Sequence, residues 1–404
     1  MKLEIFEKSK NTEIALADVE KKLFNLKTLI YQPFSKKKLD VLNALSQKFL
    51  RSELAAEYPQ IIVLGYWLRP ASIKNFINEF EENLQKNCVP APKGIAFHLP
   101  PENVDTMFIY SWAISYLMGN ANLVRLPTKL NKLSEWIIGV VTETLDKYDE
   151  LETNIFCKYS YESGFNNLFS ENCDVRVVWG GDKKISKVSE LKLKPSANSI
   201  NFPDRQSLCL IDSKKYENSN EKVKSEVAEK LFNDIFWFDQ MGCGSPKAVI
   251  FFGVLKNKDD LYKRLVNIVE KKNKIPETSV IISKFVNLNN IAGKGLSSNS
   301  RSIKNVLNIS EGKINKQIFD YFHGGGSLFH FEIASLDEIS PLLSDKTQTI
   351  SIFGLNEKNE KKLIDLMIKH GGLRVVDIGD ALSFDKIWDG VDLFSALSKL
   401  IKLK

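Results

Sequence analysis

The 404-residue sequence lacks several features that would assign it at once to a class of proteins. It has five cysteines, an odd number, and no two of them are close together in the chain. Neither a disulfide framework nor a metal site is indicated, and the cysteine usage fits a reducing compartment. The first residues, MKLEIFEK, contain no apolar segment typical of a secretory signal. We therefore expect a cytoplasmic protein without a bound metal.

Long apolar runs and clustered charge are also missing. Residues 106–124 carry no charge, but Gly119, Asn120 and Asn122 interrupt the run, which favours a buried helix over a membrane span. The formal net charge is +6, yet lysines are scattered along the whole chain. Nucleic-acid binding requires positive charge gathered on one face. We expect neither a membrane span nor a nucleic-acid partner.

The sequence does contain an alternation of short apolar runs and amphipathic stretches. Strands are predicted at about 60–67, 94–98, 121–126, 175–179, 207–212, 247–252, 328–333 and 349–354. Helices are predicted at about 72–85, 106–118, 132–145, 183–190, 220–238, 258–272, 335–343 and 356–370. A stretch between 276 and 305 is rich in Asn, Gly and Ser, and no element is assigned to it. The alternation predicts an α/β protein with parallel sheets covered by helices on both faces.

The stretch 237–253, WFDQMGCGSPKAVIFFG, carries a candidate nucleophile. Cys243 falls between a predicted helix and a predicted strand. Its neighbours Gly242 and Gly244 lack a Cβ, so the backbone could turn sharply and approach a ligand, and Pro246 prevents the helix from continuing. The alternative is a buried structural cysteine in a turn. The glycine flanks favour the nucleophile.

A second candidate is the strand end Trp179-Gly180-Gly181-Asp182. Two glycines between a strand and a helix let the backbone approach a phosphate or dinucleotide at the helix N-terminus. A purely structural turn is the alternative, because the chain has no full GxGxxG fingerprint.

Taken in order, these pieces resemble the fatty acyl-CoA reductases of the bacterial luminescence type, a branch of the aldehyde dehydrogenase superfamily. The resemblance covers about residues 58–400. It is carried by LPPENV with Asn103, GNANLVRLP with Arg125, VVWGGD, DQMGCGSP with Cys243, TQTISIFG, and WDG near the C-terminus.

The resemblance implies an aldehyde-dehydrogenase-like fold with two Rossmann-like doubly wound domains and the active site between them. A polar, lysine-rich stretch after residue 212 suggests the domain boundary. We expect an N-terminal helical region at 1–57, a dinucleotide-binding domain at 58–213, a catalytic domain at 214–370, and a segment at 371–404 that packs back on the cofactor domain. A homo-oligomer is also implied.

The resemblance further implies a chemistry. The Cys243 thiolate would attack an acyl thioester, and the resulting thioacyl-enzyme would be reduced to an aldehyde. The side-chain amide of Asn103 and the backbone N–H of Cys243 would stabilise the oxyanions. A turn-forming role is the alternative for Asn103. The acyl donor would be acyl-CoA or an acyl-carrier thioester, and an acyl-protein synthetase or an acyltransferase is a possible further partner.

The expected cofactor is NADPH. The cofactor-binding residues implied by the resemblance are Arg125, Pro127, Thr128, Lys129, Trp179, Gly180, Gly181 and Asp182. Thr128 stands where the family often has a carboxylate selective for ribose hydroxyls, and a neutral residue beside Arg125 and Lys129 would tolerate a 2′-phosphate.

Two departures from the superfamily are visible. Asn201 stands near the place of the glutamate that activates water in hydrolytic aldehyde dehydrogenases, so a hydrolytic base is missing. His323-Gly324-Gly325-Gly326 replaces a Glu-x-Phe ribose contact. The rival hypothesis is an acyltransferase or thioesterase that uses Cys243 without a redox step. His98 is the one histidine placed to be considered as a partner of the thiol.

Overall fold

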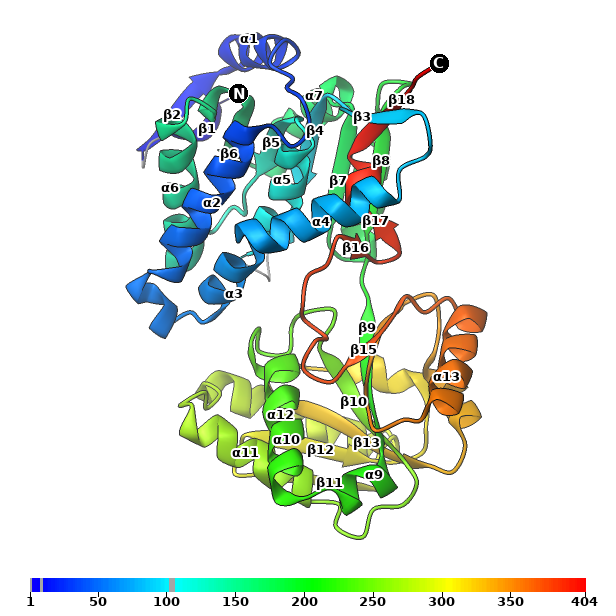
Figure 1. The fold of residues 1–404 in the computed structure, drawn as a ribbon. Helices are drawn as coiled ribbons and strands as arrows, with labels where there is room; N and C mark the ends of the chain where they lie inside the picture. The colour runs from blue at the N-terminus through cyan, green and yellow to red at the C-terminus, as the bar shows by residue number, and fades with distance from the viewer. Residues whose placement is uncertain (1, 8–9, 102–105) are drawn as a thin grey trace. The chain divides into compact units, whose positions relative to one another are not determined.

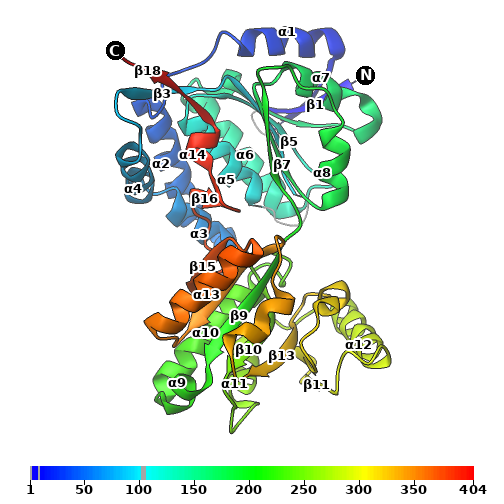
Figure 2. The same cartoon turned by 90° about the vertical axis from the view of Figure 1, so that its right-hand side faces the viewer.

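The computed structural model describes residues 2–7, 10–101 and 106–404. The chain divides into two compact units. Unit 1 comprises Met1–Pro203 and Phe384–Lys404, and unit 2 comprises Asp204–Ser383 (Figures 1 and 2). No helix in the described part of the chain is long and apolar enough to cross a membrane.

Within the described residues, unit 1 holds a seven-stranded sheet in the order β2-β1-β6-β5-β4-β7-β8. The strands are β1 (Lys2–Glu7), β2 (Lys10–Ala15), β4 (Ile95–Leu99), β5 (Ala121–Arg125), β6 (Asn154–Lys158), β7 (Val175–Trp179) and β8 (Asn198–Phe202). Strands β4 to β8 pair in parallel, whereas β1 and β2 are antiparallel at one edge. From β4 the chain continues to β5 and β6 on one side of that strand, and then to β7 and β8 on its other side. The topological switch point therefore lies between β4 and β7.

Helices cover both faces of this sheet. They are α1 (Leu16–Leu26), α2 (Lys36–Leu50), α3 (Gln60–Trp67), α4 (Pro70–Glu82), α5 (Met107–Leu117), α6 (Lys132–Lys147), α7 (Phe165–Asn172) and α8 (Asp182–Ser189), with short 3₁₀ turns η1 (Glu53–Ala56), η2 (Leu151–Thr153) and η3 (Tyr161–Ser163). One core forms between the sheet and α2 to α6, and the other between the sheet and α1, α7 and α8. Central strands β4, β5 and β7 are buried along their whole length, which explains why most of their residues are apolar.

Unit 2, in its described residues, is built on a second seven-stranded sheet in the order β11-β12-β13-β10-β9-β14-β15. The strands are β9 (Gln206–Asp212), β10 (Pro246–Phe252), β11 (Asn299–Ile303), β12 (Leu307–Glu311), β13 (Ser327–Ile333), β14 (Thr347–Phe353) and β15 (Arg374–Asp377). All neighbouring strands are parallel except β11, which is an antiparallel edge strand.

The helices of unit 2 are α9 (Ser213–Asn218), α10 (Glu221–Phe236), α11 (Asp260–Lys271), α12 (Thr278–Gly293) and α13 (Glu357–His370), with 3₁₀ turns η4 (Lys316–Tyr321) and η5 (Leu336–Leu342). Helices α10 and α11 bury their apolar residues on one face of the sheet, and α13, η4 and η5 cover the other face. Both units are therefore doubly wound α/β sandwiches, as the alternation of elements in the sequence predicts.

The C-terminal part of unit 1 contains β16 (Ile387–Trp388), β17 (Val391–Asp392), α14 (Leu393–Ala396) and β18 (Ser398–Lys402). Strand β18 pairs with β3 (Cys88–Pro92), an antiparallel ribbon apart from the main sheet. The ring of Phe384 stacks on Tyr110 and Trp388, with ring centres 4.5 and 4.9 Å apart. These contacts join the end of the chain to the core beside α5.

The unit boundaries differ from the expected domain boundaries. Because β9 is a central strand of the second sheet, the first boundary lies before residue 204 and not after residue 213. Residues 371–383 stay with unit 2, where β15 forms an edge of the sheet, and only 384–404 belong to unit 1. The N-terminal region is not wholly helical, since β1 and β2 extend the first sheet.

Two stretches take a different form from the predicted one. Residues 60–67 form helix α3 and not a strand, since a short apolar run does not distinguish a buried helix from a buried strand. The Asn-rich stretch after Pro276 contains the helix α12, which buries Lys284 and Ile291 and leaves Ile282 and Phe285 in solvent. A charged residue is thus buried in this helix while two large apolar side chains face solvent.

Candidate functional site

Cys243 lies in the loop between α10 and β10, at the amino edge of the parallel sheet of unit 2. All five cysteines are within the described residues, and among them only Cys243 is exposed. Cys157 and Cys173 are buried, and burial raises the pKa of each thiol to about 12. Cys209 is also fully buried, and burial raises its pKa further. The exposed thiol is therefore the one suited to nucleophilic chemistry.

The sharp turn of this loop is made by residues other than the expected glycines. Asp239 and Gln240 have φ angles of 49° and 63°, in the left-handed region that few non-glycine residues adopt. Gly242 and Gly244 have no such φ. Gly244 is needed for close packing, because a Cβ there would lie 2.2 Å from the carbonyl oxygen of Ala381.

The side chain of Gln240 holds the loop in place. It is buried and makes four hydrogen bonds to described parts of the chain. Its Nε2 donates to the carbonyl oxygens of Pro246 (2.9 Å) and Ser327 (2.8 Å). Its Oε1 accepts from the backbone N–H groups of Gly326 (2.9 Å) and Ser327 (3.0 Å). All its polar atoms are paired, so the amide rigidly joins the Cys243 loop to the start of β13. Sequence reasoning missed this residue.

The triglycine run packs against the same turn. Gly324, Gly325 and Gly326 have φ angles of 75°, 58° and 87°, and the N–H of Gly325 donates to the carbonyl oxygen of Asp239 (2.8 Å). Three successive left-handed residues explain why only glycine occurs here. The triglycine run thus supports the Cys243 loop.

Further contacts position Cys243 from the neighbouring strands. The hydroxyl of Ser207, in β9, donates to the carbonyl oxygen of Cys243 (2.7 Å) and accepts from the N–H of Thr349 in β14 (3.2 Å). The Cys243 loop is therefore tied to the two strands on either side of the switch point of unit 2, and any change in their register would move the thiol.

The wall behind the loop is formed by residues 379–383. The buried carboxylate of Asp234, in α10, accepts from the N–H groups of Gly379 (2.8 Å) and Ala381 (3.0 Å). Burial raises the pKa of Asp234 to about 7, although these two hydrogen bonds lower it. The guanidinium of Arg374 donates to three carbonyl oxygens of the same segment. Arg374 thus holds residues 380–383 in place.

The predicted cofactor residues of unit 1 lie at carboxyl ends of its parallel strands. Arg125 ends β5 and is buried, with its guanidinium carbon 5.1 Å from the ring centre of Tyr159. Its Nε has no hydrogen-bond partner among the described residues. Thr128 and Lys129 are exposed in the bend that follows, and Pro127 is half-buried.

The second group lies at the end of β7. The ring of Trp179 stacks on Phe202 with ring centres 3.9 Å apart. Gly180 has a φ of 147°, and a Cβ at Gly181 would meet no atom within 4 Å. Helix α8 begins at Asp182, and its N-cap residue, Gly181, makes no side-chain hydrogen bond to the first turn. The backbone there is open to an anionic group.

The structure brings the loops after β4 and β7 together at the switch point of unit 1. The ammonium of Lys184, in α8, donates to the carbonyl oxygen of Pro100 (2.8 Å). Asn103 follows in this loop but lies outside the described residues. Its role stays a prediction.

His98 belongs to the core of unit 1. Its ring nitrogens lie 2.8 Å from the hydroxyl of Ser111 and 3.1 Å from the Oδ1 of Asn122. Burial lowers the pKa of His98 to about 4, so the ring is neutral. Both ring nitrogens of His98 are therefore engaged in contacts within the core, which indicates a structural role.

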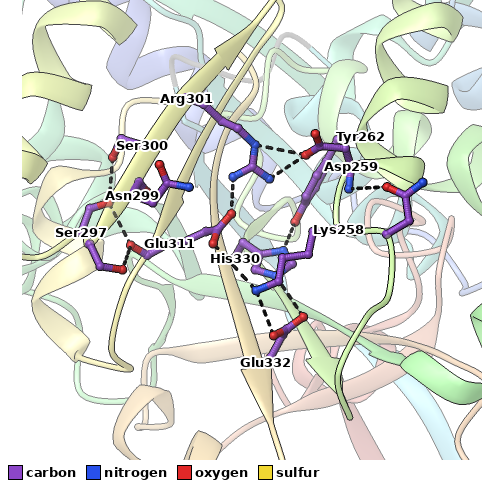
Figure 3. A network of polar contacts seen from close by, with 12 residues as sticks. Lys258, Asp259, Tyr262, Ser297, Asn299, Ser300, Arg301, Glu311, His330 and Glu332 are labelled. Atoms are coloured by element: carbon purple, nitrogen blue, oxygen red, sulfur yellow. Dashed lines mark hydrogen bonds and ion pairs between the residues drawn. The ribbon is translucent and has the colours of Figure 1, made fainter.

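A separate polar cluster lies at the opposite, carboxyl edge of the unit 2 sheet (Figure 3). Ion pairs join Lys258 to Glu332 (3.0 Å) and Arg301 to Glu311 around the buried His330. In the described part of the chain, no group of His, Cys, Asp and Glu side chains could hold a metal ion. The cluster fastens β11 to β13 and the loop before α11, and we assign it a structural role.

Comparison with known proteins agrees with this arrangement. Residues 12–283, about two thirds of the chain, match the family described as Acyl-CoA reductase (LuxC). No curated protein matches the chain.

Solved structures with the same fold include three aldehyde-oxidising enzymes. Aldehyde dehydrogenase 21 from Physcomitrella patens, in complex with succinate, is 13% identical, with a TM-score of 0.71 over 98% of this chain and 97% of that one. Glyceraldehyde-3-phosphate dehydrogenase GapN from Methanocaldococcus jannaschii, complexed with NADP, is 12% identical, with a TM-score of 0.66 over 96% and 94%. An NAD-dependent benzaldehyde dehydrogenase from Corynebacterium glutamicum is 11% identical, with a TM-score of 0.66 over 99% and 95%.

The family match covers more than half of the chain and includes the loop of Cys243. The structural matches cover nearly the whole chain, although their low identity speaks only to the fold. The chain therefore has the fold of the aldehyde dehydrogenases and belongs to the LuxC family of acyl-CoA reductases.

Proposed function

We propose that this protein reduces an acyl thioester to the aldehyde with NADPH, through a thioacyl group on Cys243. The observation that carries the proposal is the exposed thiol of Cys243 in a loop held by Gln240, Ser207 and the triglycine run. A nucleophile must be accessible and also fixed in position, and this loop meets both demands.

The first step is attack of the Cys243 thiolate on the thioester carbonyl carbon. A new carbon–sulfur bond forms, the bond to the donor sulfur breaks, and the donor leaves as a thiolate that takes a proton from solvent. The backbone N–H of Cys243 and the side-chain amide of Asn103 are the proposed oxyanion donors. Each such donor typically contributes roughly 3 kcal/mol to transition-state stabilisation.

The residues of unit 1 fit a dinucleotide. The uncapped N-terminus of α8 beside Gly180 and Gly181 offers backbone N–H groups to a pyrophosphate, and Trp179 and Asp182 flank it. The buried Nε of Arg125 is a donor that has no hydrogen-bond partner among the described residues. When bound, the nicotinamide supplies the hydride that reduces the thioacyl carbon.

NADPH is proposed over NADH because of the bend after β5. Thr128 is neutral and Lys129 is an exposed cation, so a 2′-phosphate would meet attraction there and no carboxylate. The structural neighbours include both an NADP complex and an NAD-dependent enzyme. The preference therefore depends on this chain's own residues.

Hydrolysis of the thioacyl group would waste it as free acid. Asn201, proposed to stand in place of the water-activating glutamate, lies in β8 with its side-chain oxygen accepting from the hydroxyl of Ser199 (2.9 Å). An amide does not act as a base, so the thioacyl group should await reduction. Neither the family nor the fold supports the rival acyltransferase or thioesterase function.

We also propose the acyl donor and the proteins that associate with this one. The acyl donor is proposed to be acyl-CoA or an acyl-carrier thioester, with an acyl-protein synthetase or an acyltransferase as a possible associate. A homo-oligomer is proposed from the family resemblance, and a cytoplasmic location from the cysteine usage of the sequence.

The test uses radiolabelled acyl-CoA with and without NADPH. We expect wild-type protein to consume NADPH, followed at 340 nm, and to form aldehyde, and without NADPH to retain acyl label covalently. Cys243→Ala should lose both the label and the aldehyde but still bind NADPH. Cys209→Ala is the control and should keep activity, with a loss of stability of at most a few kcal/mol. Acyl label trapped by Cys243→Ala would refute the assignment, and free acid released by the wild type without NADPH consumption would favour the thioesterase.

A further inference from the structure

Lys247 lies four residues after Cys243, at an irregularity of β10. Pro246 pairs with Ser207 of β9, but Ala248 pairs with the very next residue, Leu208. Lys247 is therefore the extra residue of a β-bulge. Bulges bend a strand and redirect the side chain of the extra residue, and they are frequent beside active sites.

The side chain of Lys247 enters a half-buried, aromatic environment. Its Nζ lies 4.9 Å from the ring centre of Phe322 and 5.8 Å from that of Phe319. Faces of aromatic rings attract cations, so these contacts favour the ammonium form. The rings also limit the rotamers of the side chain, which fixes where its charge lies.

Three charged or ionisable groups act on Lys247 electrostatically. Burial lowers the pKa of Lys247, while Asp204 and Cys243 raise it and Lys346 lowers it further. Ser207 pairs with Pro246, the residue before Lys247, and its hydroxyl also contacts the carbonyl oxygen of Cys243 (2.7 Å). Cys243 and Lys247 therefore lie at the same edge of the sheet, where the attraction between them raises the pKa of Lys247. By the same reciprocal attraction, a cation at Lys247 stabilises a negative charge on Cys243.

We propose that the Lys247 ammonium is the cation that holds Cys243 in the thiolate form. This inference rests on the proposed role of Cys243 as the nucleophile. The thiol proton passes to solvent and the thiolate remains beside the ammonium, so no other reactant is needed. A neighbouring lysine is one of the established ways in which proteins generate a thiolate near neutral pH. Lys247 acts through Cys243 and is thus a positioning residue.

Two of the four histidines have partners away from the thiol. Both ring nitrogens of His98 lie within hydrogen-bond distance of other residues of unit 1. His330 is buried in the middle of β13, opposite Val249 of β10, and its Nδ1 lies 2.8 Å from the hydroxyl of Tyr262.

The test measures the ionisation of Cys243 directly, without substrate or cofactor. Full-length protein is alkylated with iodoacetamide between pH 5 and 10, and the Cys243 peptide is followed by mass spectrometry. In the wild type we expect a midpoint below about 8.5, the ordinary thiol value. In Lys247→Met the midpoint should rise by about one pH unit, which slows alkylation at pH 7 roughly tenfold. Lys247→Arg should restore the wild-type profile.

Two controls make the outcome specific. Lys247→Gln is a second neutral variant, and thermal melts of both neutral variants establish that they are folded. Lys346→Met removes a nearby cation that repels Lys247, and its midpoint should move by less than half as much. An unchanged midpoint in both neutral variants, or an equal shift in Lys346→Met, overturns the proposal. Failure of the nucleophile assignment would appear separately, as acyl label trapped by Cys243→Ala.

Discussion

At the scale of single residues, two different constraints shape the Cys243 loop. Asp239 and Gln240 adopt left-handed backbone conformations that cost roughly 1–2 kcal/mol for each non-glycine residue. The four hydrogen bonds of Gln240 offset this cost, since each contributes about 1 kcal/mol. The loop is therefore held in a strained form by a single buried amide, which keeps the thiol in one position.

Gly244→Ala tests the close packing behind the loop. The added Cβ would lie 2.2 Å from the carbonyl oxygen of Ala381, and Arg374 and Asp234 hold that segment firmly. We expect a loss of about 1–3 kcal/mol in the free energy of unfolding, measured in urea. Displacement of the thiol by about 1 Å should slow acylation by a further factor of about 100.

Gly293→Ala is the matched control for that experiment. Gly293 ends α12 in the same unit, and a Cβ there would meet no atom within 4 Å. Its acylation rate should equal that of the wild type. Equal rates in Gly244→Ala and Gly293→Ala would show that the wall behind the loop does not position Cys243.

The residue scale also shows how far the sequence could predict the site. Cys243 was found because glycines and a helix-to-strand junction are visible in a linear pattern. Gln240, Ser207 and Asp234 were not found, since their partners lie on other strands or loops far along the chain. The role of a buried polar residue depends on its tertiary contacts, and the local spacing of residues in the sequence does not predict those contacts.

At the scale of elements, the bend after β5 is the place to test cofactor preference. Lys129→Glu would put a carboxylate in an exposed position directly after the strand that ends with Arg125. We expect the KM for NADPH to rise roughly tenfold, because attraction for the 2′-phosphate becomes repulsion. The KM for NADH, which lacks that phosphate, should change much less.

Lys147→Glu provides a control of equal charge change. Lys147 is exposed at the last residue of the 16-residue helix α6, about 24 Å along the helix from its start after the bend. Its KM values for both cofactors should match the wild type. If Lys129→Glu raises the KM for both cofactors equally, the bend after β5 does not recognise the 2′-phosphate.

Strands and helices with clear periodicity were predicted well, and the failures have physical causes. Helix α3 was expected as a strand because its apolar residues are nearly continuous, and either form could bury them. The sequence pattern does not predict helix α12, because this helix buries a lysine whose ammonium donates to the carbonyl oxygens of Asn305 and Val306. A pattern of hydrophobicity cannot indicate a helix that presents its apolar side chains to water.

At the scale of the whole molecule, each unit contains one fully buried histidine. Burial lowers the pKa of His98 in unit 1 and of His330 in unit 2 to about 4, and the hydroxyl of Tyr262 lies 2.8 Å from the Nδ1 of His330. In the unfolded chain a histidine has a pKa of about 6.5, so the unfolded state takes up protons first as the pH falls. The stability that these two neutral rings contribute is therefore fully present above about pH 6.5 and is lost as the pH falls towards about 4.

Urea unfolding at pH 7.5 and 5.5 measures this loss. Each buried histidine should contribute about 1.4 kcal/mol of destabilisation at pH 5.5. His98→Gln and His330→Gln should each reduce the loss by about that amount, in unit 1 and unit 2 respectively. His323 is exposed, so His323→Gln should leave the loss as in the wild type. A loss that neither core variant reduces would contradict the assignment of acid sensitivity to these rings.

Unit 1 is assembled from two parts of the chain, with the whole of unit 2 between them. Residues 384–404 are translated after unit 2, so unit 2 can fold on the ribosome while unit 1 is still incomplete. Until then β3 has no β18 to pair with, and Tyr110 has no Phe384 stacked on it. An unpaired strand edge and an uncovered aromatic ring both invite aggregation. Unit 2, which carries Cys243, can thus complete its fold first, and the nascent chain is most exposed to aggregation while unit 1 waits for residues 384–404.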